Sequence, residues 1–104
     1  MGSVFYFGTM IGCYIIYSAK LNRFYIGVTH EDILLRIEKH NQANYGKHRF
    51  TATASDWVLF LFIPCCDYAH AIRVERKVKS MKSTSYVRNL VKYPDLLEKL
   101  VSST

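Results

Sequence analysis

The chain has 104 residues, and half of them are hydrophobic, which is enough for one domain with a buried core but leaves little room for a second. Its net charge of +6 is consistent with a nucleic acid or an anionic membrane as partner. Three cysteines without a Cys-x-x-Cys pair argue against a disulfide framework and a zinc knuckle, and no apolar run is long enough for a membrane span. We therefore expect a soluble intracellular protein, cytoplasmic or, in a eukaryote, nuclear.

The first predicted element is a β-hairpin. Two apolar runs, IGCYIIY and FYIGV, flank the polar segment SAKLNR and are rich in β-branched and aromatic residues. The expected turn pairs Ser18 with Arg23. This register places Tyr25 opposite Ile16, which shares a face with Tyr14 because side chains alternate along a strand. Both tyrosine hydroxyls then lie on one face of the sheet, whereas a register shifted by one residue would separate them.

A helix is predicted from the sequence THEDILLRIEKHN, with Thr29 expected as its N-terminal cap. Arg36 and His40 are four residues apart, so they lie on the same side of this helix and could border the surface that carries the two tyrosines. The alternative is an exposed cation and a solvated histidine. Apolar residues at helical spacing should face the sheet: Ile33, Leu34 and Ile37.

Residues 42–55 show no hydrophobic periodicity and are predicted to form a loop that carries Lys47 and Arg49. These basic side chains could follow a phosphate backbone, or they could simply be solvated. Residues 56–63, DWVLFLFI, are almost continuously apolar and stop at Pro64. They predict a central strand that is buried on both faces and forms the third member of the sheet.

A second helix is predicted from Asp67, its cap, through DYAHAIRVERKVKSMKS. Its apolar stripe is expected at Ala71, Val74, Val78 and Met81. Glu75 lies among these core-facing positions, where a lone carboxylate is costly unless it is paired, protonated or bound to a cation. An ordinary helix-surface ion pair with Arg76 or Lys79 is the alternative. A short final helix, PDLLEKLV, is expected to begin at Pro94.

The triplets Gly12-Cys13-Tyr14 and Tyr25-Ile26-Gly27 resemble the paired signature of the GIY-YIG nuclease family, with Cys13 where the family usually has isoleucine. The resemblance extends over roughly residues 12–90 of a single domain that spans residues 1–104. It implies an α+β fold, in which a small three-stranded antiparallel sheet, made of the N-terminal hairpin and a third strand, is flanked by helices. It also implies an endonuclease, a hydrolase of phosphodiester bonds.

The same resemblance implies a catalytic site, carried over residue by residue. Tyr14 would act as general base, and Tyr25 would orient the attacking water or a phosphate oxygen. His40 would relay a proton or hold Tyr14. Arg36 would supply a permanent positive charge with a planar fork that matches a phosphate. Glu75 would be the single metal ligand, which suits a hydrated Mg²⁺ or Mn²⁺ better than Zn²⁺.

Basic residues gather in the second half of the chain and are expected to bind DNA phosphates. The candidates, besides Lys47 and Arg49, are Arg73, Arg76, Lys77, Lys79, Lys82 and Arg88, and Asn89 is an additional candidate site residue. The sequence thus predicts a metal-dependent DNA endonuclease whose specificity comes from DNA shape, a partner protein or a homodimer. The alternative is a catalytically silent nucleic-acid-binding module of the same fold. A role at a membrane is disfavoured, because no predicted helix leaves a broad apolar face exposed.

Overall fold

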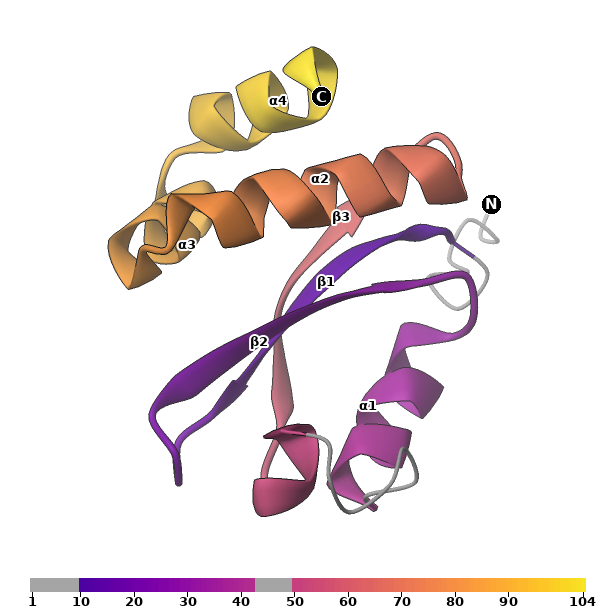
Figure 1. The fold of residues 1–104 in the computed structure, drawn as a ribbon, viewed down its shortest axis with the longest axis vertical. Coiled ribbons are helices and arrows are strands. Elements are labelled where there is room, and N and C mark those ends of the chain that lie inside the picture. Colours follow the sequence, from indigo (N-terminus) through magenta and orange to yellow (C-terminus); the bar gives the residue numbers. More distant parts are fainter. Residues whose placement is uncertain (1–9, 43–49) are drawn as a thin grey trace, which may run out of the picture.

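A three-stranded antiparallel sheet forms the centre of this computed structural model, with the strands in the order β2-β1-β3 (Figure 1). The structure describes residues 10–42 and 50–104, so the predicted phosphate contacts Lys47 and Arg49 lie outside the described residues. The elements are β1 (Gly12–Ser18), β2 (Arg23–Thr29), α1 (Ile33–Asn41), the 3-10 helix η3 (Phe50–Thr53), β3 (Val58–Pro64), α2 (Tyr68–Met81), α3 (Thr84–Lys92) and α4 (Pro94–Ser103). This α+β architecture confirms the predicted fold class.

The hairpin has the register that the sequence predicts. Ser18 lies opposite Arg23, and Ile16 lies opposite Tyr25. Asn22 adopts a left-handed backbone conformation in the turn, with φ of 53°, which asparagine tolerates better than most residues. Tyr25 therefore shares a face of the sheet with Tyr14, because every second side chain of a strand points to the same side.

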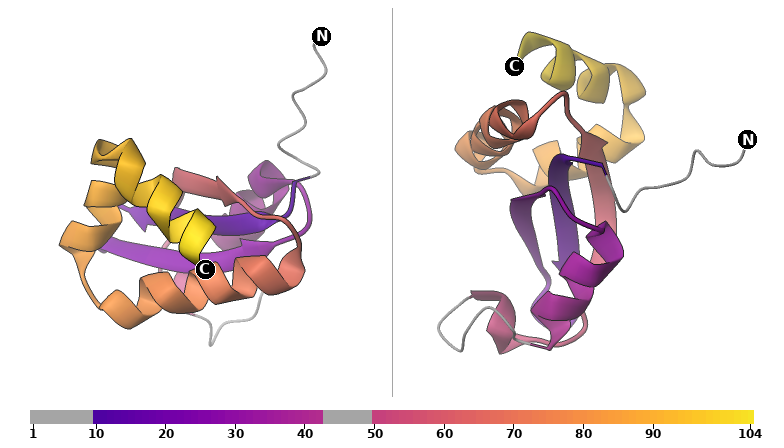
Figure 2. Two further views of the ribbon diagram at one scale, coloured as in Figure 1. Left: turned by 90° about the horizontal axis from the view of Figure 1, so that it is seen from above. Right: turned by 90° about the vertical axis from the view of Figure 1, so that its right-hand side faces the viewer.

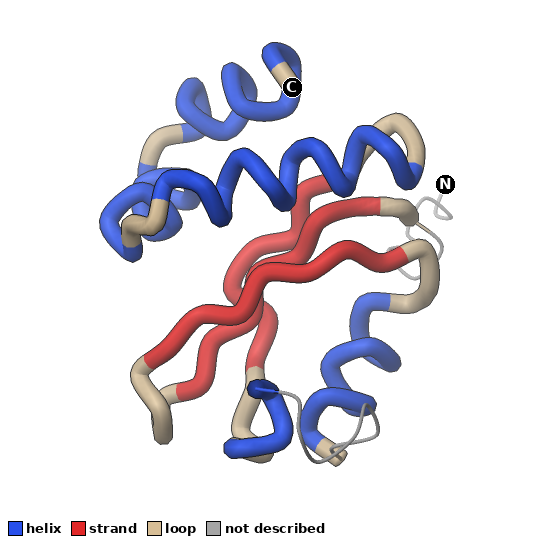
Figure 3. Tube along the Cα trace, viewed as in Figure 1, coloured by secondary structure: helices blue, strands red, loops and turns tan. Residues whose placement is uncertain are grey.

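Asp56 ties the hairpin turn to the segment that precedes β3. Its carboxylate accepts hydrogen bonds from the Ser18 hydroxyl at 2.5 Å and from the backbone N–H of Lys20 at 2.9 Å. These bonds, and the Ser18 bond above all, hold the pKa of Asp56 below its usual range. The hairpin turn and the short helix η3 accordingly lie at the same end of the sheet, as Figure 3 shows.

The central strand is β1, and the prediction that the third strand would be central was wrong. β3 lies at the edge of the sheet, where Val58 is 57% exposed and Leu59 is 41% exposed. Phe60 nevertheless packs into one core, and Phe62 packs into the other. An edge strand between two helical layers is therefore also apolar on both faces. A continuous apolar run therefore does not show whether the strand that it forms has one neighbouring strand or two.

The sheet separates two helical layers, which Figures 1 and 2 show from three directions. Cys13 and Ile15 of β1 pack into the core formed with α2, α3 and α4. Tyr14 and Ile16 pack into the core formed with α1 and Trp57. The alternation along one strand thus gives the protein one core on each side of the sheet. It also places the two signature tyrosines in the layer that α1 covers.

Helix α1 presents a buried stripe at helical spacing, which consists of Ile33, Ile37 and His40. The predicted burial of Leu34 was wrong, because this residue is 68% exposed. His40 takes the third buried position and is only 3% exposed. The predicted cap was also wrong. Asp32, and not Thr29, caps α1, and its carboxylate accepts a 2.8 Å hydrogen bond from the backbone N–H of Leu34.

Helix α2 begins as predicted, because the carboxylate of Asp67 accepts a 2.8 Å hydrogen bond from the backbone of the first turn. The helix ends at Met81, where Lys82 turns into a left-handed conformation with φ of 47°. Ser83 then caps α3, a separate helix that the sequence did not reveal. Met81 is 41% exposed and so does not belong to the predicted apolar stripe.

Helix α4 begins at Pro94, as predicted, and a buried histidine fastens it to α2. The backbone N–H of Cys66 donates a 3.0 Å hydrogen bond to Nδ1 of His70. Nε2 of His70 therefore carries the ring proton and donates it to the carbonyl oxygen of Val101, 3.1 Å away. None of the helices in residues 10–42 and 50–104 is long and apolar enough to cross a membrane.

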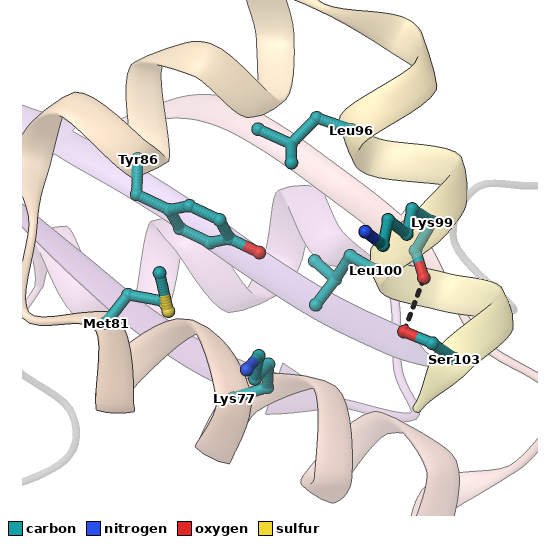
Figure 4. Close-up of a pocket in the computed structure, with 7 residues that line it drawn as sticks. All are labelled: Lys77, Met81, Tyr86, Leu96, Lys99, Leu100 and Ser103. Carbon is teal, nitrogen blue, oxygen red and sulfur yellow. Dashed lines mark hydrogen bonds between the residues drawn. The ribbon is translucent and has the colours of Figure 1, made fainter.

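A cavity of about 250 Å³ lies between α2, α3 and α4 (Figure 4). Its wall is formed in part by Tyr86 and Leu100, and Lys77 and Lys99 border it. Burial raises the pKa of the Tyr86 phenol. These helices cover the face of the sheet that carries Cys13. The cavity and the two signature tyrosines therefore lie on opposite sides of the sheet.

Candidate active site

Tyr14 lies at the centre of a group of polar side chains between β1 and α1. Its hydroxyl lies 2.7 Å from Nε2 of His40, and Nε of Arg36 donates a 3.4 Å hydrogen bond to it. Tyr14 is 1% exposed and His40 is 3% exposed, so both side chains of this contact are buried. The structure thus brings both predicted α1 residues to the predicted tyrosine. They are not the exposed cation and solvated histidine of the alternative.

Tyr25 joins this group from the neighbouring strand. Its ring centroid lies 6.4 Å from that of Tyr14 and 5.2 Å from that of His40. The ring of Trp57 packs edge-on against Tyr25 at a centroid distance of 6.4 Å. Tyr25 is only partly buried, so it is the more accessible of the two tyrosines.

The two signature triplets meet where Tyr14 lies across Gly27. The two residues are directly opposite in the register, and a Cβ atom on Gly27 would lie 2.6 Å from the tyrosine hydroxyl oxygen and 2.7 Å from Cζ. A Cβ atom on Gly12 would meet the carbonyl oxygen of Ile63 and lie 2.7 Å from Cζ of Phe62. Both glycines therefore permit a close approach that any other residue would prevent. The glycine of the second triplet makes room for the tyrosine of the first.

Glu31, which was not among the site residues predicted from the sequence, lies beside this group with its side chain partly exposed. Oε2 of Glu31 lies 3.1 Å from Nη1 of Arg36, and Oε1 lies 3.1 Å from Nζ of Lys39. Hydrogen bonds from Lys39 and then Arg36 lower the pKa of Glu31, which keeps it ionised at neutral pH. Glu31 precedes α1, so helical spacing gives no signal for these contacts. The path of the chain from β2 into α1 brings the carboxylate to the two cations.

Glu75, the predicted metal ligand, lies in the other helical layer, on α2. Its Oε2 accepts a 3.1 Å hydrogen bond from Nζ of Lys79, and its side chain is 18% exposed. This is the helix-surface ion pair that the sequence offered as the alternative. Within the described parts of the chain, no hydrogen bond or ion pair connects Glu75 with Tyr14 or Arg36.

Comparison with protein families identifies the family of this chain. The family of GIY-YIG catalytic domains matches residues 10–88, which is most of the chain. The chain belongs to the GIY-YIG family. No curated protein and no solved structure matches it. The match ends within α3, so α4 lies wholly outside the matched residues and the cavity beside it lies partly outside them.

The departure of this GIY-YIG domain from the usual signature lies at Cys13. The residue is 0% exposed and packs into the core on the α2 side of the sheet. Burial raises the pKa of the Cys13 thiol, and the neighbouring Cys65 and Glu75 raise it further. A buried neutral thiol packs as a small hydrophobic side chain. The substitution therefore preserves the core and leaves the tyrosine face unchanged.

GIY-YIG nucleases generally require a divalent metal ion, and Glu75 as its ligand stays a prediction. The described residues contain no group of three or more His, Cys, Asp and Glu side chains that could enclose a metal. One carboxylate suits Mg²⁺ or Mn²⁺, which keep several water ligands, better than Zn²⁺. The partner of Glu75 is also easy to displace, because the Lys79 side chain is 52% exposed.

The predicted DNA contacts of the GIY-YIG domain in α2, in α3 and between these helices are all exposed. They comprise Arg73, Arg76, Lys77, Lys79, Lys82 and Arg88. Lys79 and Lys82 line a groove of about 290 Å³ between β2, α2 and α3. Asn89 is partly buried on α3. These residues belong to the helical layer that carries Glu75, and their contact with DNA stays a prediction.

Proposed function

We propose that this GIY-YIG domain is a divalent-metal-dependent endonuclease that hydrolyses phosphodiester bonds in DNA. The observation that supports this function most is the contact of the Tyr14 hydroxyl with both Arg36 and His40. A phenol that acts as general base has to lose its own proton before it can accept one from the attacking water. A phenol between a cation and an imidazole is suited to this task.

The hydrogen-bond directions favour a proton route through His40. Because Nε–H of Arg36 donates to the Tyr14 oxygen, the hydroxyl can direct its own proton to Nε2 of His40. A free phenol titrates at about pH 10, and a neighbouring guanidinium favours the ionised form. In the proposed mechanism Tyr14 passes its proton to His40 and then accepts one from the attacking water. Tyr25, the more accessible tyrosine, orients that water.

Arg36 binds the scissile phosphate in this mechanism. Its guanidinium is permanently charged, and its planar fork can form two parallel hydrogen bonds to a phosphate. One nitrogen, Nε, is directed to Tyr14, and another, Nη1, is directed to Glu31 at the partly exposed side of the group. A phosphate on this side would lie next to the proposed base.

Glu75 would hold the divalent cation. When bound, the cation acts as a Lewis acid that stabilises charge on the phosphate and on the leaving oxygen. Glu75 contributes its carboxylate to this site, and Lys79 has to release it first. Lys79 is then free to contact a neighbouring phosphate of the DNA backbone.

A second candidate function is a nucleic-acid-binding module of the same fold that does not cleave. The ion pair of Glu75 with Lys79, in the helical layer opposite Tyr14, favours this function. DNA is the partner in both cases, because the exposed basic residues of α2 and α3 suit a phosphate backbone. Specificity would come from DNA shape, a partner protein or a homodimer.

A cleavage panel separates the two functions. Supercoiled plasmid and single-stranded, duplex, flap and junction DNA are incubated with Mg²⁺ or Mn²⁺, with and without a chelator. Arg36→Lys should lose most of the cleavage, because an ammonium keeps the charge but not the planar fork. Arg23→Lys, at an exposed position in β2, is the matched control and should cleave normally. Binding of DNA without metal-dependent cleavage of any substrate would establish the binding module instead.

A further inference from the structure

The carboxylate of Glu31 lies between two cations that are one helical turn apart. It accepts hydrogen bonds from Nη1 of Arg36 at 3.1 Å and from Nζ of Lys39 at 3.1 and 3.3 Å. A carboxylate that bridges an arginine and a lysine uses the same donors that a phosphate group would use. Because Arg36 also donates to the Tyr14 hydroxyl, this anion-binding position lies next to the proposed base.

The Glu31 side chain can leave this position at little cost. The side chains of Glu31, Arg36 and Lys39 are 28%, 29% and 40% exposed, and ion pairs at such positions contribute little to stability. A nucleic-acid phosphate that replaces the carboxylate would restore the hydrogen bonds of both cations.

The backbone around Glu31 is fixed independently of its carboxylate. The backbone N–H of Glu31 donates a 3.0 Å hydrogen bond to the Thr29 hydroxyl, and Thr29 is 1% exposed. On the other side, Asp32 caps α1. The side chain of Glu31 can therefore rotate away from the cations while the loop and the helix stay in place.

We propose that Arg36 and Lys39 form a phosphate-binding subsite, which the Glu31 carboxylate occupies in the free domain and which a nucleic-acid phosphate takes over on binding. This inference rests on the proposed function, in which Arg36 contacts a phosphate. It adds Lys39 as a second phosphate contact. It also makes Glu31 an internal competitor, which lowers the affinity of the free domain for nucleic acid.

The test compares Glu31→Gln with Glu38→Gln. Both substitutions remove one negative charge, but the carboxylate of Glu38 is exposed on α1 and accepts a hydrogen bond only from Gln42 among the described residues. The dissociation constant for a duplex and a single-stranded oligonucleotide is measured by fluorescence anisotropy in a chelator, so that no cleavage occurs. Glu31→Gln should bind about threefold to fivefold more tightly than Glu38→Gln, because removing an exposed ion-pair competitor has an effect of this order.

A double-mutant cycle with Lys39→Gln tests the second contact. Lys39→Gln should weaken binding, and the gain from Glu31→Gln should shrink in its presence, because both substitutions act on the same phosphate. Circular dichroism spectra and melting curves establish that every variant is folded. An equal gain from Glu31→Gln with and without Lys39 would remove Lys39 from the subsite and overturn the proposal.

The remaining outcomes separate this inference from the proposed function. If the wild type cleaves DNA but Glu31→Gln binds no more tightly than Glu38→Gln, the inference fails and the nuclease stands. If Glu31→Gln instead slows cleavage at saturating DNA with unchanged binding, Glu31 positions Arg36 and the inference also fails. Tighter binding by Glu31→Gln without any cleavage by the wild type would support the subsite and overturn the nuclease. A wild type that binds neither oligonucleotide would overturn both.

Discussion

The hydroxyl of Tyr14 lies 2.7 Å from Nε2 of His40, although 26 positions separate the two residues in the sequence. The contact joins the central strand to the last turn of α1, and both side chains are almost completely buried. Buried polar groups need hydrogen-bond partners, and the Tyr14 hydroxyl and the His40 imidazole are partners for each other. The pair therefore stabilises the packing of α1 and, in the proposed mechanism, also moves a proton.

Three tyrosine-to-phenylalanine variants separate the general base from its neighbours. Tyr14→Phe should lower the cleavage rate by about a hundredfold or more and remove its rise with pH, because the base itself is lost. Tyr25→Phe should lower the rate but keep the pH dependence, since a positioning hydroxyl does not ionise. Initial rates at saturating DNA, measured across a pH series, distinguish these two effects.

Tyr17→Phe is the control for this series. Tyr17 lies on the same strand, but its hydroxyl donates to exposed Asn22 and its ring lies beneath Arg88 of α3, so the substitution should leave cleavage unchanged. If Tyr25→Phe is the variant that loses the pH dependence, the roles of Tyr14 and Tyr25 are exchanged. If neither variant loses it, the base is not a phenol, and His40 becomes the next candidate to test.

Glu75→Gln tests the metal ligand. The variant should lose metal-stimulated cleavage and keep DNA binding, because the amide matches the carboxylate in size but not in charge. Its melting temperature should change little, since the exposed Lys79 contributes no more than about 1 kcal/mol through the ion pair. Cleavage is measured against Mg²⁺ and Mn²⁺ concentration, with Glu98→Gln on α4 as the charge-matched control. Undiminished cleavage by Glu75→Gln would remove Glu75 from the metal site.

Gly27→Ala tests the close approach of the two signature triplets. The added Cβ atom would lie 2.6 Å from the Tyr14 hydroxyl oxygen, and the tyrosine ring is buried, so the ring or the strand has to shift. We expect the free energy of unfolding to fall by about 1–3 kcal/mol, as for other overpacked cores. Urea denaturation of Gly27→Ala, Tyr14→Ala and the double variant provides the measurement. Gly27→Ala should cost much less when Tyr14 is already alanine, and an equal cost in both backgrounds would contradict the contact.

Asp56→Asn tests the link between the hairpin turn and β3. The pKa of Asp56 is lower in the folded chain than the value of about 4 expected in the unfolded chain. Its carboxylate therefore stabilises the fold fully above pH 4, and this stabilisation disappears as the pH falls through the lower, folded pKa. Urea denaturation should find Asp56→Asn less stable than the wild type at pH 7. The difference should shrink as the pH is lowered below 4, and a difference that does not change with pH would contradict the role of the charge.

Local patterns in the sequence determined the hairpin and several helix ends. The polar turn and the alternation of residue types are properties of neighbouring residues, so they sufficed to pair Ser18 with Arg23 and to place Tyr14 and Tyr25 on one face. Asp67 likewise marks a helix start through a hydrogen bond within the first turn, and Pro94 marks one through its fixed backbone angle. The spacing of Arg36 and His40 placed both on one side of their helix, but whether that side meets the tyrosines was decided by the packing of α1 on the sheet.

Only the tertiary structure decided the order of the strands and the environment of the charged residues. The apolar run of β3 is the same whether it has one neighbouring strand or two, so the sequence did not show that β1 is central. Glu31 reaches Arg36 through the path of a loop, and Glu75 lies in the layer opposite Tyr14 because α2 crosses the other face of the sheet. Such contacts depend on how whole layers pack, and the pattern of one segment does not contain that information.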